Sequence, residues 1–492
     1  MRSVTVVLPH QPAGHWIGGN WVTTGAPGES VDPATGSVIG HYVKAGADEA
    51  EQAIAVAKQV FLSTTWRFDR DLRARVLNAM ADVFEARADE LVEMLALENG
   101  KIKPEARFEV SMSGPTIRFN AALALTDTGR AARVSQGAVT IVVREPSGVA
   151  GIIAPWNSPV ALVLRSLAPA MAAGTTTVVN LPVATAQTNA LIASIISETP
   201  GLPPGVVNVL IGGHESADVL VRSPDVPVLS FTGSTKTGKA ISAAAAPNLK
   251  RLGLELGGKA PMMVFDDADL DTAIPKIMQA LTVFAGQFCM TGSRLLVQSG
   301  VAESVRSRLA DRFRQLRVGP AADPASEMGP IIDHENVARI DAMVVDAISA
   351  GARIIVRGGP VTDGELAKGA FYRPTLLEVD DGHLPIVQEE VFGPVLTMMV
   401  FDDEAGAVAL ANDSDYGLSA SVFSSDVDLP LRVALQLQCG TVWINDWAVL
   451  HNQSEEGGYK GSGQGRMRGL AVIDDFIEYK HIALAPGIPQ ST

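Results

Sequence analysis

Residues 148–179 read GVAGIIAPWNSPVALVLRSLAPAMAAGTTTVV, with two short apolar runs on either side of a longer one. The short runs, 148–154 and 175–179, have the length and composition of buried strands. Residues 159–173 between them have the length of a helix. A strand, a helix and a second strand predict a parallel pair joined by a crossover, so this stretch assigns the chain to the α/β class.

The same alternation continues along the chain. We expect helices at 188–197 and 215–221 and strands at 206–211, 228–231 and 252–256, which together form a doubly wound parallel sheet. A second alternation, from 260 to about 423, predicts another domain with its own sheet. Ligands of parallel sheets bind at the carboxyl ends of the strands, where the loops 155–157, 212–213 and 232–238 lie.

The other segments predict a helical region and a ribbon. Helical periodicity runs from 47 to about 125. Residues 129–146 alternate in polarity and predict a hairpin with an exposed edge, which the tail at 473–485 is expected to join. Such an edge often pairs with another subunit.

Composition excludes several classes of protein. The 492 residues are 47% hydrophobic and 19% charged, as in a globular protein of two or three domains. The formal net charge of −15 disfavours binding to nucleic acid or to an anionic membrane surface. No uncharged apolar run reaches the ~18 residues that span a bilayer, and the run before Pro9 is too short for a signal peptide. Two cysteines cannot build a disulfide framework or a thiolate metal site, so we expect a reducing cytoplasm and no metal.

Cys289 lies in the stretch FAGQFCMTGSR, residues 284–294, between an expected helix and an expected strand. Flanking glycines let the backbone approach a substrate closely, which suits a nucleophile. An isolated cysteine is more often a small buried apolar residue, and these residues alone leave that alternative open.

Residues 233–239, GSTKTGK, have phosphate-loop spacing and open an expected helix. Ala240 stands where a nucleotide triphosphatase needs Ser or Thr for magnesium, so a phosphate-binding helix N-terminus is favoured over such an enzyme.

Two further polar residues end apolar strands. Burying the Glu255 carboxylate is costly, which indicates a functional role for it. The alternative is a structural salt bridge to Lys250 or Lys259. Asn157 could donate to an oxyanion or could cap the helix that follows it.

Seven motifs together resemble those of aldehyde dehydrogenases, in that family's order, over about residues 16–485. They are PWN (155–157), LPPGVVN (202–208), FTGS (231–234), LELGGK (254–259), GQFC (286–289), EVFGP (390–394) and GGYK (457–460). The resemblance implies a Rossmann-type coenzyme-binding domain (1–126 and 148–256), an α/β catalytic domain (257–468) and an oligomerisation ribbon and tail (127–147 and 469–492). It also implies a homodimer or homotetramer.

The resemblance assigns catalytic roles. Cys289 would attack a small-molecule aldehyde, with the Asn157 side chain and the Cys289 N–H stabilising the oxyanion. Hydride transfer to the nicotinamide would leave a thioester, which water activated by Glu255 would hydrolyse to the acid. The coenzyme-binding residues would be Ile153, Pro155, Trp156, Gly233, Ser234, Gly238, Leu256, Glu390 and Phe392.

Departures from the family pattern affect the coenzyme. Residues 180–187, NLPVATAQ, lack the lysine and glutamate that usually follow this strand, Ser166 replaces a usual lysine, and Met467 a frequent glutamate. We expect NAD, because a 2′-phosphate would need a cation, with NADP not excluded. The alternative is a catalytically impaired member of the family that acts as a binding or structural protein.

Substrate clues conflict. Arg165 would act as an anion clamp, whereas Trp447 and Glu456 would form a cation box, and all three could instead be rim residues. Cys439 has no comparable partners and is expected to be a packed thiol.

Overall fold

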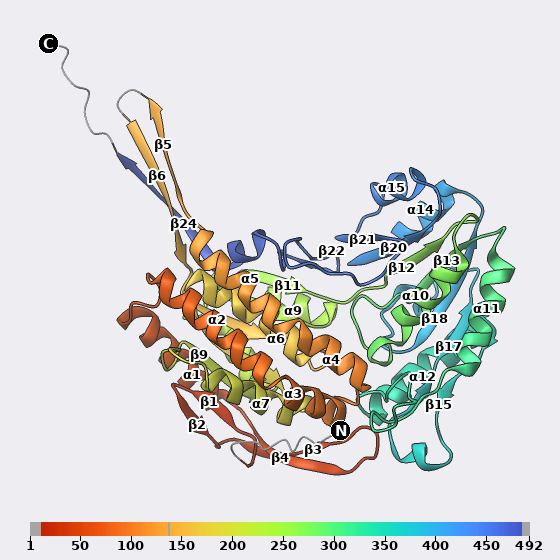
Figure 1. Cartoon of the computed structure of the whole chain (residues 1–492), viewed down its shortest axis with the longest axis horizontal. Helices are drawn as coiled ribbons and strands as arrows, with labels where there is room; N and C mark the ends of the chain where they lie inside the picture. Colours follow the sequence, from red (N-terminus) through yellow and green to blue (C-terminus); the bar gives the residue numbers. More distant parts are fainter. Residues whose placement is uncertain (1–10, 136–137, 485–492) are drawn as a thin grey trace.

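The computed structural model describes residues 11–135 and 138–484, and its largest sheet has eight strands in the order β2-β1-β9-β8-β7-β10-β11-β23 (Figure 1). The strands are β1 (His15–Ile17), β2 (Asn20–Val22), β7 (Val149–Ile153), β8 (Thr176–Pro182), β9 (Val207–Gly212), β10 (Val228–Thr232), β11 (Arg251–Glu255) and β23 (Gly463–Gln464). The five strands from β9 to β11 are parallel, and β1, β2 and β23 add antiparallel edges. The predicted doubly wound sheet is confirmed.

The direction of winding reverses between β7 and β10. From β7 the chain adds β8 and β9 on one side and then crosses to add β10 and β11 on the other. Both β7 and β10 are fully buried, as their apolar sequences predict. Ile153 pairs with Phe231, so the loops that follow the two strands leave the same edge of the sheet. Such a reversal point is where open α/β sheets bind ligands.

Helices cover both faces of this sheet. They are α1 (Ala47–Ser63), α2 (Arg70–Ala86), α3 (Ala88–Met94), α4 (Lys103–Ser111), α5 (Ser113–Thr126), α6 (Pro159–Ala173), α7 (Ala186–Ser197), α8 (His214–Arg222) and α9 (Thr235–Ala245). Helix α6 is almost entirely buried because it packs against β7 and β8 on one side and against α2 and α5 on the other. Arg165 is therefore a charge on a buried helix.

A second sheet has seven strands in the order β14-β17-β18-β13-β12-β20-β21, all parallel except β14. They are β12 (Pro261–Val264), β13 (Arg294–Gln298), β14 (Arg353–Val356), β17 (Thr375–Glu378), β18 (Val395–Phe401), β20 (Ser419–Phe423) and β21 (Thr441–Ile444). Its main helices are α10 (Leu270–Thr282), α11 (Ala302–Gln315), α12 (His334–Ser349) and α14 (Glu404–Asn412). The predicted second sheet is confirmed, but β21 extends it beyond residue 423.

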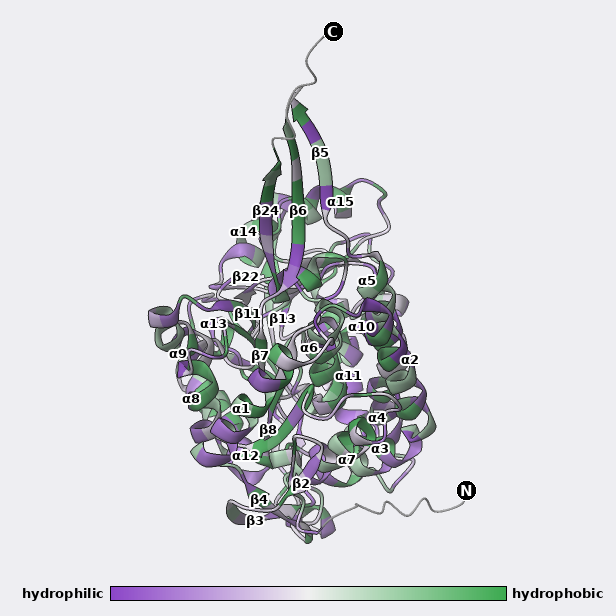
Figure 2. Cartoon of the chain, turned by 90° about the vertical axis from the view of Figure 1, so that its left-hand side faces the viewer, coloured by the Kyte–Doolittle hydropathy of each residue, from purple (hydrophilic) through white to green (hydrophobic). Residues whose placement is uncertain are grey.

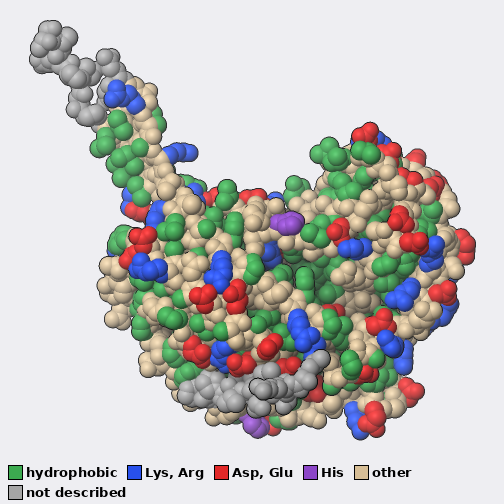
Figure 3. All heavy atoms as spheres, viewed as in Figure 1, with side chains coloured by type: hydrophobic (Ala, Val, Ile, Leu, Met, Phe, Trp, Pro, Cys, Tyr) green, Lys and Arg blue, Asp and Glu red, His purple; other side chains and the backbone are tan. Residues whose placement is uncertain are grey.

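Three strands form a ribbon that projects from the body of the molecule (Figure 1). The strand β6 (Ala138–Pro146) lies between β5 (Arg130–Ser135) and β24 (Ile477–Leu484), which confirms the predicted hairpin and the pairing of the tail with it. Apolar residues are frequent along the ribbon (Figure 2), and hydrophobic side chains gather on the face shown in Figure 3. Val134 is 62% exposed and Tyr479 53%. The expectations for residues 1–10 and for Ala485 lie outside the described residues.

Within the described ranges, no helix has the length and apolarity that crossing a bilayer requires.

Candidate active site

The link from β11 to β12, residues 256–260, joins the two sheets and brings three of the motifs together. A Cβ atom on Gly257 would lie 2.3 Å from Glu390 Oε2, and one on Gly258 would lie 2.5 Å from the Cys289 carbonyl oxygen. No other residue type could occupy these two positions without a shift of the neighbouring groups. The two glycines thus let the Glu390 carboxylate and the Cys289 backbone approach this link.

The turn that carries Cys289 has a strained backbone before it. Phe284 and Ala285 have φ values of 51° and 55°, in the left-handed region that non-glycine residues avoid. Gly286 follows at 75°, and a Cβ atom there would lie 2.4 Å from the Gly393 carbonyl carbon. Glu105 of α4 accepts a 3.0 Å hydrogen bond from the Phe284 N–H. Contacts from both sides therefore hold the turn in place.

Cys289 lies between two cavities and lines both of them. The larger, about 540 Å³, is mostly apolar and lies toward α4, α6 and α10. The smaller, about 330 Å³, lies at the reversal point of the large sheet. Cys289 and Leu162 are shared by the two linings. A ligand in either cavity would therefore reach the same sulfur atom.

The surroundings of Cys289 keep its sulfur protonated at neutral pH. Its side chain is half-buried, and burial raises the pKa of the thiol to about 12, although Arg165 acts in the opposite direction. Asn157 Nδ2 donates to the carbonyl oxygen of Gln287 at 2.9 Å. The N-cap of α6 is Ser158. The capping alternative for Asn157 is therefore wrong, and its amide lies beside the cysteine turn.

Glu255 ends β11 and is only 3% exposed. Its Oε1 atom has no hydrogen-bond partner in the part of the chain that the structure describes, and burial raises its pKa to about 8. The salt-bridge alternatives are wrong. Lys250 donates to the carbonyls of Leu220, Ser223 and Val226, and Lys259 Nζ has no partner among the described residues. Glu255 lines neither cavity directly.

The smaller cavity collects most of the predicted coenzyme residues. Its lining includes Pro155, Trp156, Gly233, Ser234, Leu256, Glu390 and Phe392, and the predicted catalytic residue Asn157 lines it as well. The rings of Trp156 and Phe392 meet edge to face at 5.7 Å. Glu390 Oε1 accepts from the Gly258 N–H at 3.1 Å, and burial raises the pKa of Glu390 to about 7.

The glycine-rich loop after β10 differs in detail from the prediction. The Gly233 N–H donates to the Glu255 carbonyl at 3.0 Å, so it is not free for a phosphate. Ser234 caps α9 by accepting from the Thr237 N–H. Gly238 lines no coenzyme cavity but makes room for Leu256, whose Cδ2 atom would lie 2.6 Å from a Cβ there.

A third cavity, of about 360 Å³, lies beyond this loop and contains Ile153 in its lining. Asn180, at the end of β8, accepts from Ser216 Oγ at 2.7 Å. Arg222 is the arginine of this lining, and its guanidinium is bound to Asp218 at 2.8 Å. A 2′-phosphate would therefore have to compete with Asp218 for that cation.

Arg165, Trp447 and Glu456 all line the larger cavity, and two of them are paired with each other. Arg165 Nη1 donates to Glu456 Oε1 at 2.7 Å, and Arg468 Nε donates to Glu456 Oε2 at 2.8 Å. Burial would raise the pKa of Glu456, but the two arginines outweigh it and lower the pKa. Trp447 Nε1 donates to the Met290 carbonyl. The rim alternative is wrong for all three residues, because each of them is buried.

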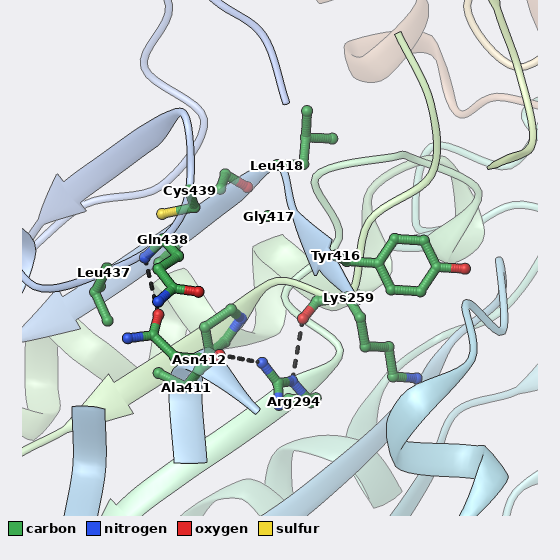
Figure 4. Close-up of a pocket in the computed structure, with 13 residues that line it drawn as sticks. Lys259, Arg294, Ala411, Asn412, Tyr416, Gly417, Leu418, Leu437, Gln438 and Cys439 are labelled. Carbon is green, nitrogen blue, oxygen red and sulfur yellow. Dashed lines mark hydrogen bonds between the residues drawn. The ribbon is translucent and has the colours of Figure 1, made fainter. Parts of the chain in front are cut away.

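Cys439 lies elsewhere, in the lining of a cavity of only about 10 Å³ with Lys259, Arg294 and Tyr416 (Figure 4). Its thiol donates to the Thr441 carbonyl, and burial raises its pKa to about 12. This is the packed thiol that we expected.

Comparison with known proteins agrees with this geometry over almost the whole chain. The family model described as "Aldehyde dehydrogenase family" matches residues 21–482. The chain belongs to the aldehyde dehydrogenase family. Betaine aldehyde dehydrogenase of Bacillus subtilis (strain 168) is 36% identical over 474 residues, which cover 95% of this chain and 96% of that protein. The 2-aminomuconic semialdehyde dehydrogenase of Danio rerio is 35% identical over 476 residues, which cover 96% of this chain and 97% of that protein.

Solved structures show the same similarity. Betaine aldehyde dehydrogenase from Staphylococcus aureus in complex with NAD+ superposes with a TM-score of 0.95 at 34% identity, over 99% of this chain and 97% of that one. HpcC from Thermus thermophilus superposes with a TM-score of 0.93 at 37% identity, over 98% of this chain and 96% of that one. The fold of this chain is therefore that of an aldehyde dehydrogenase. The smaller and third cavities suit a dinucleotide, because they lie on either side of the α9 N-terminus.

Three residues of the site were missed by sequence reasoning. Arg468 binds Glu456, Glu105 holds the Phe284 N–H, and Arg339 lines the coenzyme cavity. Arg468 had a signal, since it stands two positions after the arginine of the Gly-Arg pair. Glu105 and Arg339 lie on helices rich in surface charge, and their sequence context did not distinguish them.

Proposed function

We propose that Cys289 is the nucleophile of this dehydrogenase, because its sulfur lines both the apolar cavity and the coenzyme cavity. The thiol gives its proton to water in the cavity as the sulfur attacks the aldehyde carbon: the S–H bond breaks, a C–S bond forms, and the carbonyl π electrons move to the oxygen. The Asn157 amide, which lies beside the cysteine turn, and the Cys289 N–H then stabilise the negative oxygen, each donor contributing about 3 kcal/mol.

NAD, when bound, supplies the acceptor for the hydride that leaves this adduct. Trp156, Glu390 and Phe392 would hold the nicotinamide end, and the N-terminus of α9 would serve the pyrophosphate. The pairing of Arg222 with Asp218 favours NAD over NADP.

Glu255 acts as the base for hydrolysis of the thioester. Its carboxylate takes a proton from water, the water oxygen bonds to the acyl carbon, and the C–S bond breaks to release the acid. A carboxyl group with a pKa of about 8 is basic enough for this task at neutral to alkaline pH.

We further propose that the substrate is an aldehyde with an aromatic body that is neutral or negatively charged at its far end. The cavity wall presents Phe108, Phe288, Trp447, Leu162, Val449 and Leu450. Both oxygens of Glu456 are bound to arginines, so this carboxylate is not free to bind a cation. Two arginines and one glutamate leave the cluster with an excess of positive charge.

A matched set of aldehydes tests both parts of this proposal. Benzaldehyde, 4-carboxybenzaldehyde and 4-(trimethylammonio)benzaldehyde share one body and differ in charge. We expect NADH formation with the first two, a kcat/KM at least tenfold lower with the cationic compound, and no activity in Cys289→Ser. Cys439→Ser is the matched control and should retain activity. Equal kcat/KM for all three would overturn the proposed substrate class, and activity of Cys289→Ser the proposed nucleophile.

We also propose that the subunit divides as its sheets suggest, into coenzyme-binding, catalytic and ribbon parts, and that it forms a homodimer or homotetramer through the ribbon. Both outer strands of the ribbon have unpaired edges within the described residues, and exposed apolar side chains lie along it. Light scattering of the full chain and of Val134→Lys tests this, because a charge on the ribbon should shift the mass toward the monomer. Two free thiols fit a reducing cytoplasm as the compartment.

A further inference from the structure

Asp475 inserts its carboxyl group into a notch beside the strand that ends in Glu255. Asp475 belongs to the short helical segment η6 (Ala471–Phe476), which packs against β11. Its Oδ2 atom lies 3.0 Å from where a Cβ of Gly253 would be and 2.8 Å from where a Cβ of Gly465 would be. Leu254 of β11 pairs with Gln464 of β23 in antiparallel fashion. Gly253 and Gly465, the next residues along, therefore lie opposite each other at the end of β23. The missing side chains of both glycines make the notch.

The notch lies on the same face of β11 as the Glu255 side chain. Gly253 and Glu255 are two residues apart on one strand, and side chains at that spacing point to the same face, about 6.6 Å apart. The Asp475 carboxyl fills the position of the absent side chain at 253. The two carboxyl groups are therefore neighbours along the strand, and Asp475 is among the charges that act on Glu255.

Asp475 lies between the interior and the surface of the protein. The residue is only partly buried, yet its Oδ2 atom is buried and has no hydrogen-bond partner among the described residues. Burial raises its pKa to about 7, with Asp474 acting in the same direction and Arg251 and Arg466 against it. This value is close to the value of about 8 for Glu255, so a proton can move between the two groups at little cost.

The other charged groups that act on Glu255 cannot accept a proton from it. Arg165 and Arg466 carry N–H donors and no acceptor atom. Glu456 is held as a carboxylate by two arginines, which lower its pKa. Four charged residues of the described chain act on the pKa of Glu255. Among them, Asp475 alone has a side-chain oxygen without a hydrogen-bond partner.

We propose that Asp475 accepts the proton that Glu255 takes from the hydrolytic water, and that it releases this proton to solvent. The O–H bond on Glu255 breaks, an O–H bond forms on Asp475, and Glu255 returns to the carboxylate for the next turnover. The proposal rests on the proposed role of Glu255 as the base. Asp475 touches neither aldehyde nor coenzyme, so it is a positioning residue that acts through Glu255.

Hydrolysis of 4-nitrophenyl acetate without coenzyme separates the steps, because the nitrophenol burst reports acylation of Cys289 and the later steady rate reports deacylation. In Asp475→Asn we expect an unchanged burst and deacylation slower by about tenfold. Loss of a negative neighbour lowers the pKa of Glu255, so the rising limb of the deacylation rate should move to lower pH. Added imidazole should restore part of the rate. A purely structural role would give neither the shift nor the rescue.

Asp474→Asn is the matched control, because its carboxylate binds Arg144 near the surface, and its deacylation rate should stay within twofold of wild type. Asp475→Ser, which fills less of the notch, should reproduce the defect if the Asn variant folds poorly. Wild-type deacylation in either Asp475 variant, beside slow deacylation in Glu255→Gln, would overturn the relay alone. Wild-type deacylation in Glu255→Gln would instead overturn the proposed base.

Discussion

The Arg165 guanidinium lies 2.7 Å from the Glu456 carboxylate, and the two side chains are 4% and 5% exposed. Arg468 binds the second oxygen of the same carboxylate. A buried ion pair of this kind is costly to break, because removing one partner leaves the other charge in an apolar wall.

Glu456→Gln should therefore destabilise the protein by about 3 kcal/mol, since two buried arginines lose their counter-charge. Urea unfolding followed by tryptophan fluorescence measures this change. Glu455→Gln is the matched control, because Glu455 is exposed and accepts from the Leu470 N–H, which a glutamine oxygen can also do. A loss of the same size in both variants would contradict the account of the buried cluster.

Asn157→Ala should lower kcat by about 10²-fold, because the variant removes a donor to the oxyanion. The affinity for NAD should change little, and fluorescence quenching by the dinucleotide checks this. A variant with reduced NAD affinity and normal kcat would show that Asn157 serves the coenzyme instead.

Gly258→Ala should disrupt catalysis without unfolding the protein. Its Cβ would lie 2.5 Å from the Cys289 carbonyl oxygen, so the cysteine turn must move. Displacement of a nucleophile by about 1 Å can cost 10²-fold in rate. Gly46→Ala is the control, because the nearest atom to its added Cβ would be 3.6 Å away. Steady-state rates and thermal melting of the two variants give the comparison, and full activity of Gly258→Ala would refute the close contact.

The pH dependence of deacylation should follow Glu255. The carboxylate is the active form, so the rate should rise with pH and reach half its maximum near pH 8. Stopped-flow deacylation between pH 6 and pH 10, in two buffer series, measures the limb. A limb near pH 4.5, the ordinary range of glutamate, would be inconsistent with the buried environment.

The free energy of unfolding should also depend on Glu255, but it should fall with rising pH where the deacylation rate rises. The folded-state pKa of Glu255 is raised, so the contribution of this group to stability is fully present below its unfolded pKa of about 4.5 and is lost as the pH rises through about 8. Glu255→Gln lacks this loss and should be more stable than wild type at pH 9, by ~4 kcal/mol, with the difference shrinking toward pH 5. Denaturant unfolding at both pH values checks the sign.

Much of this molecule was predictable because its signals are local. The parallel strands around Pro155 and Phe231 follow from short apolar runs between helices, and the position of Asn157 follows from the rule that ligands bind at strand ends. The motif resemblance supplied Cys289, Glu255 and Glu390 together.

The remainder depends on pairings between distant segments. Arg165 and Glu456 are far apart in sequence, and separately they suggested opposite substrates, whereas in the fold each neutralises the other. The need for glycine at 253 and 465 becomes clear only in the fold, where the Asp475 carboxyl occupies the space of both missing side chains. Spacing along one chain carries no information about such contacts.

The central claim is that the Cys289 sulfur carries the acyl group and that Glu255 is needed to remove it. The most direct measurement is mass spectrometry of tryptic peptides from Glu255→Gln, quenched in acid after mixing with benzaldehyde and NAD. The account predicts a benzoyl mass on the peptide that contains Cys289 and none on the peptide that contains Cys439. A benzoyl group on Cys439, or no acyl adduct while NADH still forms, would contradict it.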